Sequence, residues 1–338
     1  MPTLEEIARL SNVSRSTVSR VINNAPNVSA ETRAKVLAVV RQLDYHPNVI
    51  ARSLAAGCTR ILGLIVPFGL TTTFRDPFFP VFIPAVSSAC SAHGYSLMLW
   101  LAEQEYEERM IRQVLGNGLL DGVIVFTIHL SEEIMSEVLA SNLPYVLIGQ
   151  HSAQAPDAAY VDVENRRGAQ EAVTHLLRMG YRRIAHIAGP LDTVCAQHRL
   201  VGYKDALRTR RRRIDEDLVV AGDFTEARGY DAMKELLPRK PEAVFAANDM
   251  MALGALRACR DSGIRVPEDV AIVGFDDVAL SASSDPPLTT VRQPSEQMGI
   301  AATEMLVDIL QTGDAEPRQI ALPTELVIRQ SCGSTAGV

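Results

Sequence analysis

The chain has 338 residues, 47% of them hydrophobic and 22% charged, which is typical of a folded protein of two or three domains and excludes a disordered chain. Its net charge of −7 taken alone argues against nucleic acid, but the charge is uneven. Residues 1–60 carry eight Lys and Arg against four Asp and Glu, a balance of +4, which leaves −11 on the remainder. A basic segment before an acidic body is typical of a protein that binds DNA with one end.

Other function classes find little support in the sequence. The five cysteines are scattered without a C-x-x-C pair, which predicts neither disulfides nor a zinc site and favours a reducing cytoplasm. The start of the chain lacks the pattern of a secretory signal peptide, and no apolar run is long enough to span a membrane. No P-loop, G-x-S-x-G or H-E-x-x-H motif is present. We therefore expect a cytoplasmic protein without cofactor or metal that is not an enzyme.

The basic segment begins with two predicted helices joined by a tight turn. Thr3 and Glu6 form a capping box, and Ile7 and Leu10 give the first helix an apolar stripe. Asn12 suits the left-handed conformation of the turn that follows.

The second helix, over residues 14–23, is expected to face a DNA major groove. Ser14 caps it. The spacing puts Val18, Val21 and Ile22 on the buried side and Arg15, Ser16, Ser19, Arg20 and Asn23 on the outer side. An outer face of guanidiniums, hydroxyls and an amide, with no carboxylate, can bond base edges and phosphates.

A third helix is predicted between Ser29, which caps it, and Pro47, which stops it, with an apolar stripe of Val36, Val40 and Leu43. Residues 1–46 are thus a small all-α domain with a helix-turn-helix. Residues 47–60 form a connector that could make two helical turns, too short to be stable alone.

The sequence of this head resembles the LacI/GalR family of bacterial transcriptional regulators. The matching segments are Thr3–Ala8, Val13–Ser14, Thr17–Asn23, Val28–Ser29, Thr32–Arg33, Leu43–Tyr45, Pro47–Asn48 and Ala51–Leu54. The resemblance implies that the connector is a hinge helix that orders on operator DNA, where Leu54 wedges into the minor groove and kinks it. Without the family context, a plain linker with Leu54 as a minor apolar anchor is the simpler interpretation.

We expect two copies of the chain to bind a near-palindromic, double-stranded operator, because a helix-turn-helix dimer has two-fold symmetry. The residues expected to read base pairs are Arg15, Ser16, Arg20 and, through the kink, Leu54. Those expected to position phosphates are Thr17, Ser19, Asn23 and Tyr45. No leucine-heptad tail follows, so we expect a homodimer and no tail-mediated tetramer.

From Ile61 onward, apolar strands alternate with helices, which predicts parallel, doubly wound sheets. A first series runs to Ile148, and a second starts at Tyr160. The resemblance implies an α/β effector domain over residues 61–338 with two lobes, as in periplasmic binding proteins, and three crossings near Asp162, Val291 and Pro323. The expected first lobe is about 61–161 and 292–322, and the second about 162–291 and 323–338.

Ligands of such folds lie at the carboxyl ends of strands, in a cleft between the lobes. The resemblance and these strand ends nominate the effector-binding residues Asp76, Phe78, Phe79, Arg199, Asn248, Phe275, Asp276 and Gln293. For Asp76, a helix cap is an additional role. For Arg199, an ion pair across the cleft is the alternative. Asp249 and Asp277 are expected to cap helices instead.

An acid, an amide, an Arg and aromatic rings suit a neutral polyhydroxyl ligand, so we expect a sugar first and a purine or nucleoside second. Where relatives often have Asp-Arg, this chain has Gly149-Gln150, which leaves the ligand's identity open. The function expected is a repressor controlled by this small molecule. Residues 61–338 alone would also fit a solute-binding protein for a sugar with no DNA role, or an enzyme on the same scaffold. The head at residues 3–54 argues against both.

Overall fold

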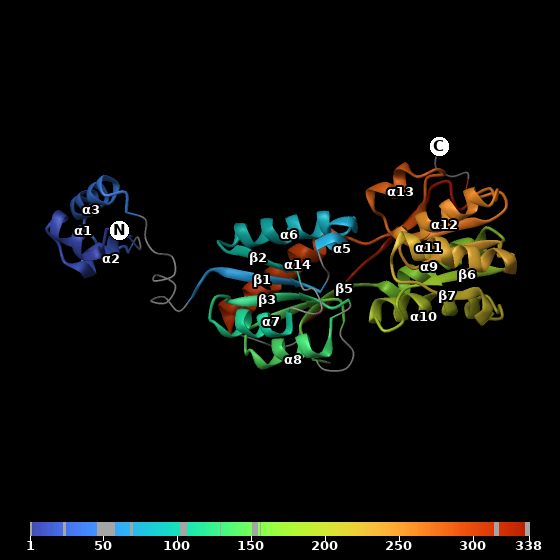
Figure 1. The fold of residues 1–338 in the computed structure, drawn as a ribbon, viewed down its shortest axis with the longest axis horizontal. Coiled ribbons are helices and arrows are strands. Elements are labelled where there is room, and N and C mark those ends of the chain that lie inside the picture. Colours follow the sequence, from blue (N-terminus) through green and yellow to red (C-terminus); the bar gives the residue numbers. More distant parts are fainter. Residues whose placement is uncertain are drawn as a thin grey trace. The chain divides into compact units, whose positions relative to one another are not determined.

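The computed structural model describes residues 2–22, 25–45, 58–67, 70–101, 107–128, 130–150, 155, 157–313 and 318–334. The chain divides into two compact units, Met1–Thr59 and Arg60–Val338 (Figure 1). Asn23 and most of the predicted hinge, Leu54 included, lie outside the described residues. Within the described part, no helix is long and apolar enough to cross a membrane.

The first unit contains α1 (Leu4–Ser11), α2 (Arg15–Ile22) and α3 (Ala30–Gln42). The predicted caps form: the hydroxyls of Thr3, Ser14 and Ser29 accept the backbone N–H groups of Glu6, Thr17 and Thr32. Asn12 takes the left-handed conformation, with φ of 53°. The core that the helices share is Ile7, Ala8, Val18, Val21 and Val36.

One prediction about this head is wrong. Leu10 does not complete the apolar stripe of α1, because 49% of it is exposed. The buried position, four residues after Ile7, belongs to Ser11, whose hydroxyl donates to the Ile7 carbonyl at 2.6 Å. A serine is accommodated there because its own helix satisfies the hydroxyl.

The second unit has two lobes, each built on a six-stranded sheet. The first lobe contains β1 (Ile61–Val66), α5 (Leu70–Arg75), α6 (Phe79–Ala92), β2 (Ser96–Leu101), α7 (Glu107–Gly116), β3 (Gly122–Phe126), α8 (Glu132–Ala140), β4 (Tyr145–Ile148), β5 (Tyr160–Val163), α14 (Ser295–Thr312) and β11 (Gln319–Leu322). The second contains α9 (Asn165–Arg178), β6 (Ile184–Ala188), α10 (Val194–Thr209), β7 (Val219–Ala221), α11 (Glu226–Leu236), β8 (Ala243–Ala246), α12 (Asp249–Asp261), β9 (Ala271–Asp276), α13 (Ala279–Ser283), β10 (Thr289–Arg292) and β12 (Glu325–Val327).

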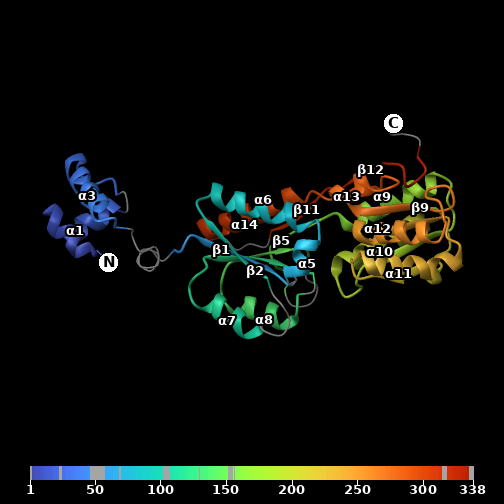
Figure 2. The same ribbon diagram turned by 45° about the horizontal axis from the view of Figure 1, so that its top comes forward.

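The two sheets have corresponding strand orders, β11-β5-β4-β3-β1-β2 and β12-β10-β9-β8-β6-β7, which explains the internal similarity of the chain. In the first sheet, α6 and α14 cover one face and α7 and α8 the other, as Figures 1 and 2 show together. In the second sheet, α9 and α10 cover one face and α11 and α12 the other. Strands covered on both faces are apolar throughout, as β1 is.

The chain passes between the lobes three times: after β5, after β10 and between β11 and β12. Tyr160–Val163, which the sequence suggests as the start of the second series, instead pairs with β4 and β11 in the first sheet. The strands β10, β11 and β12 are short, and the sequence analysis did not predict them. Two ladders beside the crossings join segments remote in sequence, β5 with β11 and β10 with β12.

Helices α11 and α12 approach closely because a glycine of each helix lies against the backbone of the other. Gly229 of α11 lies against Met251, and Gly254 of α12 lies against Glu226. A Cβ at Gly254 would meet the Glu226 carbonyl and the Tyr230 amide, so we expect Gly254→Ala to lower the free energy of unfolding by about 1–3 kcal/mol. Gly116→Ala, at the end of α7 with nothing near its Cβ, is the control and should be neutral or stabilising. Urea unfolding measures both. Equal stability of the two variants would contradict this packing.

The core of the second lobe holds a buried histidine, which predicts acid sensitivity. His186 stacks between Tyr203 and Phe245, and its Nδ1 lies 2.8 Å from the Phe245 carbonyl. Burial lowers the pKa of His186 to about 4. The unfolded chain therefore binds a proton that the folded chain excludes between about pH 6.5 and 4, so stability falls as pH falls through this window.

We expect the loss at His186 to reach about 3 kcal/mol by pH 4. In His186→Phe, which preserves the stack, the pH slope of unfolding should shrink. In His93→Gln, which alters an exposed histidine, the slope should stay as in the parent chain. Denaturant unfolding from pH 7.5 to 4.5 gives the slopes, and an unchanged slope in His186→Phe would refute the assignment.

Candidate DNA-reading helix and ligand cavity

Helix α2 exposes the side chains that the sequence assigns to base reading. Arg15, Ser16 and Arg20 are exposed, and the first turn of the helix contains no acid. Arg15 forms an ion pair with Glu5 at 3.1 Å, with both side chains more than half exposed. Exposed pairs of this kind are weak, so the pair does not prevent the guanidinium from bonding a guanine edge.

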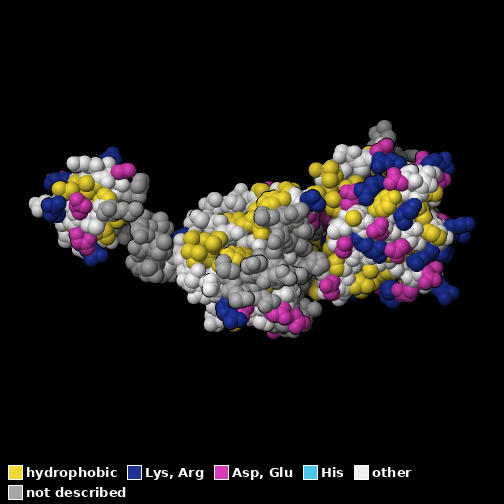
Figure 3. All heavy atoms as spheres, in the orientation of Figure 1, with side chains coloured by type: hydrophobic (Ala, Val, Ile, Leu, Met, Phe, Trp, Pro, Cys, Tyr) yellow, Lys and Arg dark blue, Asp and Glu magenta, His cyan; other side chains and the backbone are white. Residues whose placement is uncertain are grey.

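The residues assigned to phosphate contacts lie deeper in the surface. Thr17 and Ser19 are half-buried, and the Thr17 hydroxyl lies 2.8 Å from that of Ser14. Tyr45 is also half-buried, and its ring packs on the core of the head. Figure 3 shows both Lys and Arg and Asp and Glu side chains on the surface of this unit, as on the second lobe.

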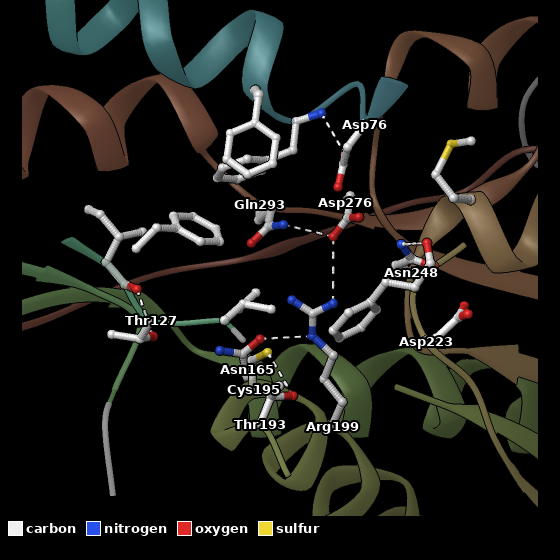
Figure 4. Close-up of a pocket in the computed structure, with 18 of the residues that line it drawn as sticks. Asp76, Thr127, Asn165, Thr193, Cys195, Arg199, Asp223, Asn248, Asp276 and Gln293 are labelled. Atoms are coloured by element: carbon white, nitrogen blue, oxygen red, sulfur yellow. Dashed lines mark hydrogen bonds and ion pairs between the residues drawn. The ribbon is translucent and has the colours of Figure 1, made fainter. Parts of the chain in front are cut away.

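A cavity of about 560 Å³ lies between the two lobes, a volume typical of small-molecule sites. Its walls are the segments that follow β1, β3 and β4 in one lobe and β6, β7, β8 and β9 in the other. The structure brings together at this cavity the predicted residues Asp76, Phe78, Phe79, Arg199, Asn248, Asp276 and Gln293 (Figure 4). Carboxyl ends of parallel strands thus face the cavity from both sides.

Arg199, from α10, is fixed at the bottom of the second-lobe wall. Its Nε donates to Asn165 at 2.8 Å (Figure 4), and its Nη1 donates to the Ala247 carbonyl at 2.6 Å. The same Nη1 lies 3.6 Å from a carboxylate oxygen of Asp276, and the guanidinium sits 3.8 Å above the centre of the Phe275 ring. The ion pair joins two residues of the second lobe, so it does not cross the cleft as the alternative supposed.

Asp276 ends β9 in a strained conformation, with φ of 122°. Strain of this kind clusters at functional sites, where the surrounding structure holds it. The Gln293 amide, beyond the second crossing, donates to Asp276 at 2.7 Å (Figure 4). Burial raises the pKa of Asp276 well above its usual range, although Arg199 acts in the opposite direction.

The first lobe supplies an acid and a cluster of rings. Asp76 accepts the Phe78 amide at 2.9 Å, and burial raises the pKa of Asp76. The ring of Phe78 packs 5.4 Å from that of Phe79 and 5.6 Å from that of Phe126, and all three residues line the cavity. Phe224 lines it from the second lobe. Flat apolar faces therefore flank the polar centre.

The expectation that Phe275 contacts the effector needs correction. Its ring is fully buried beneath Arg199 and is not part of the cavity wall. Successive side chains of a strand point in opposite directions. The ring of Phe275 therefore packs in the core on one face of the sheet, whereas Asp276 points to the cavity. Phe275 thus supports the guanidinium and does not face the ligand.

The two acids expected to cap helices have other partners. The cap of α12 is Asn248, whose side chain accepts the Met251 amide at 2.9 Å. Asp249 is buried and accepts the hydroxyls of Ser281 and Thr290, and burial raises its pKa to about 6. Asp277 instead pairs with two guanidiniums, those of Arg292 and Arg329, at 2.7 and 2.6 Å.

Acids outnumber bases in the cavity wall. The acids are Asp76, Asp162, Asp192, Asp223, Glu226 and Asp276, and the bases are Arg75, Arg199 and Arg257. Arg257 is paired with Glu226 at 2.6 Å, and Arg199 lies beside Asp276. An anionic ligand would meet excess negative charge, whereas a neutral ligand rich in hydroxyl donors would meet acceptors.

Sequence reasoning missed several polar residues of the wall. Those not nominated include Thr127, Asp162, Asn165, Thr193 and Asp223. Each lies at or within a few residues of the end of a strand, and that position was the available signal. Gly149 and Gln150, the departure noted above, line the cavity too; Gly149 has φ of 83°, which suits glycine.

Fold and cavity together define a DNA-binding head on a two-lobed ligand-binding domain. Residues 3–48 match the family of bacterial regulatory proteins of the lacI type, and residues 173–332 match a periplasmic binding protein-like domain. The chain is 40% identical to the HTH-type transcriptional regulator CelR of Thermobifida fusca, over 98% of each chain. It is 35% identical to the ribose operon repressor of Escherichia coli K12, over 98% of this chain and 100% of the repressor.

A third relative is the HTH-type transcriptional repressor PurR of Shigella sonnei, 34% identical over 98% of this chain and 97% of that protein. Among solved structures, the CelR–cellobiose complex has a TM-score of 0.78 and 38% identity, over 98% of this chain and 100% of that one. The lac repressor dimer bound to operator and the anti-inducer ONPF has a TM-score of 0.85 and 30% identity, over 98% and 99%.

The chain belongs to the LacI family of bacterial regulatory proteins. It is a DNA-binding transcriptional regulator, with the helix-turn-helix head and the two-sheet α/β domain expected from the sequence. The alternative of a solute-binding protein with no DNA role is not supported, because the relatives match the head as well as the lobes.

Proposed function

We propose that the protein is a repressor that binds a near-palindromic operator as a homodimer, in the cytoplasm, and responds to a neutral sugar bound between the lobes. The observation that carries the sugar is the cavity wall, where acidic and amide acceptors surround Arg199 and phenylalanine rings lie on both sides. Hydroxyls bond the acceptors, and the apolar face of a sugar ring packs on aromatic rings.

The effector-binding set is Asp76, Phe78, Phe79, Arg199, Asn248, Asp276 and Gln293, and the base-reading set is Arg15, Ser16, Arg20 and Leu54. Relatives support the ligand class, since CelR is described in complex with cellobiose and another relative is a ribose operon repressor. Gln293 bonds Asp276 from beyond a crossing, so ligand contacts bias the lobe arrangement through differential affinity for the two states.

A purine or nucleoside is the second candidate, favoured by the rings of Phe78 and Phe224 in the wall, which could stack on a planar base. The wall's excess of acids favours the sugar, because hydroxyls offer more donors than a purine does. We expect no chemical turnover of either ligand.

The first test is selection of binding sites from random DNA by the purified chain, without ligand and at low salt. An enriched inverted repeat supports a dimeric operator reader, and no enrichment, with or without cell extract, contradicts it. Calorimetric titration with cellobiose, ribose, glucose, guanine and adenosine then tests the effector class. Binding of guanine or adenosine and of no sugar would replace the sugar by the second candidate.

A further inference from the structure

A buried acceptor at the edge of the cavity lacks a partner. Asp162 lies in β5, directly before the first crossing, and only 3% of it is exposed. Its Oδ1 accepts the Asn165 amide at 2.9 Å and the Val163 amide at 2.7 Å. Its Oδ2 is buried and has no hydrogen-bond donor among the residues that the structure describes.

An acceptor in this state needs a donor. Buried polar atoms are nearly always hydrogen-bonded, and an unsatisfied carboxylate oxygen is costly. Burial raises the pKa of Asp162 above its usual range, with the Val163 amide and Arg199 opposing. Asp162 is part of the cavity wall although Oδ2 itself is buried, so a small movement of the side chain would bring Oδ2 within reach of a ligand hydroxyl.

The position of Asp162 connects the cavity to the crossings. Asn165 donates to Asp162 and accepts from Arg199, which lies beside Asp276, which accepts from Gln293 beyond the second crossing. A continuous chain of polar contacts therefore runs from the first crossing to the second along the base of the cavity. A ligand bonded to Asp162 would join this chain at its first-lobe end.

We infer that Asp162 is a specificity-determining residue, whose Oδ2 accepts a hydrogen bond from one hydroxyl of the bound sugar. The inference rests on the proposed sugar response and adds to it a residue of the first crossing. Asp162 thus selects ligands that have a hydroxyl donor at one ring position. Through the hydrogen bonds of Asp162 with Asn165 and of Asn165 with Arg199, the bound hydroxyl is connected to Arg199.

The test uses the full chain, the sugar of the panel that binds it, and the monodeoxy analogues of that sugar. Asp162→Asn keeps the size of the side chain but puts an N–H donor where Oδ2 accepts. We expect the parent sugar to bind this variant about 10- to 100-fold more weakly. One monodeoxy analogue should bind the protein without substitutions with a similar loss of affinity. The affinity of that analogue should not fall further when Asp162 is replaced by Asn.

Asp231→Asn is the matched control, since it removes the same charge from an exposed residue outside the cavity wall. It should change sugar affinity by less than about 3-fold, because exposed charges are screened. Equal loss in both variants would assign the effect to net charge and overturn the inference. Unchanged sugar affinity in Asp162→Asn would also overturn the inference. So would a loss of affinity from the substitution that adds to the loss from the missing hydroxyl for every deoxy analogue.

Folding and function are separated by two further readouts. The melting temperature of Asp162→Asn should equal or exceed that of the unchanged chain, because a buried unpaired charge is removed. Should that variant unfold, Asp162→Ser serves in the same deoxy-analogue comparison, with the same outcomes. If the protein without substitutions binds no sugar of the panel, the proposed function is contradicted. If it binds a sugar and the substitution at Asp162 does not alter the affinity, only the present inference is contradicted.

Discussion

Asp276→Ala should abolish the response to sugar and leave operator binding intact. Asp276 lies beside Arg199 and accepts from Gln293, so its removal leaves a buried guanidinium without its carboxylate. Removing one partner of a buried charge pair typically costs about 2–5 kcal/mol in binding, which corresponds to a loss of about 30- to 5,000-fold in affinity. Calorimetry with the sugar and fluorescence anisotropy with labelled operator measure the two effects.

Two companion variants make the Asp276 result interpretable. Asp276→Asn keeps the shape of the side chain, and asparagine tolerates positive φ, so it should fold and still lose most of the sugar affinity. Asp277→Asn changes the neighbouring acid, which pairs with Arg292 and Arg329 and is not part of the cavity wall. Its sugar affinity should be unchanged. Loss of operator binding in Asp276→Asn would indicate a folding role for Asp276.

Arg15→Ala should change which DNA the protein prefers. The exposed guanidinium of Arg15 stands at the start of α2, and a bidentate contact to one base pair is worth about 1–3 kcal/mol. We expect the affinity for the selected operator to fall about 5- to 150-fold and the preference at one position of each half-site to disappear. Anisotropy with the operator and its single-base variants gives the profile.

Thr17→Val and Tyr45→Phe are the matched comparisons for the reading helix, because each removes one hydroxyl assigned to phosphate. They should weaken binding to all operator variants alike, by about 1 kcal/mol, without altering the order of preference. A uniform loss in Arg15→Ala, of the same form as in these two, would mean that Arg15 holds the backbone and does not read a base.

Part of the ligand cavity could be predicted from the sequence. Strand ends and the family resemblance together nominated seven of the residues that line the cavity, and Arg199 came from the resemblance alone. Strand ends are informative because the carboxyl end of a parallel strand opens on the ligand side of its sheet. The nomination of Phe275 was wrong, since the direction in which its side chain points depends on strand register, and its ring is buried. Asp162 escaped notice because its missing donor is visible only when every neighbour is placed.

The sequence by itself determined the helices of the head, their serine and threonine caps, and the alternation of strands and helices from Ile61 onward. Those features depend on contacts within a few residues, so they can be read along the chain. Only the tertiary structure decided that β5 lies between β4 and β11 in the first sheet and that Asp249 binds hydroxyls of α13 and β10. It also placed Arg199 between Asn165 and Asp276. These partners lie far apart in the sequence, and pairing between such segments is decided by the packing of the whole domain.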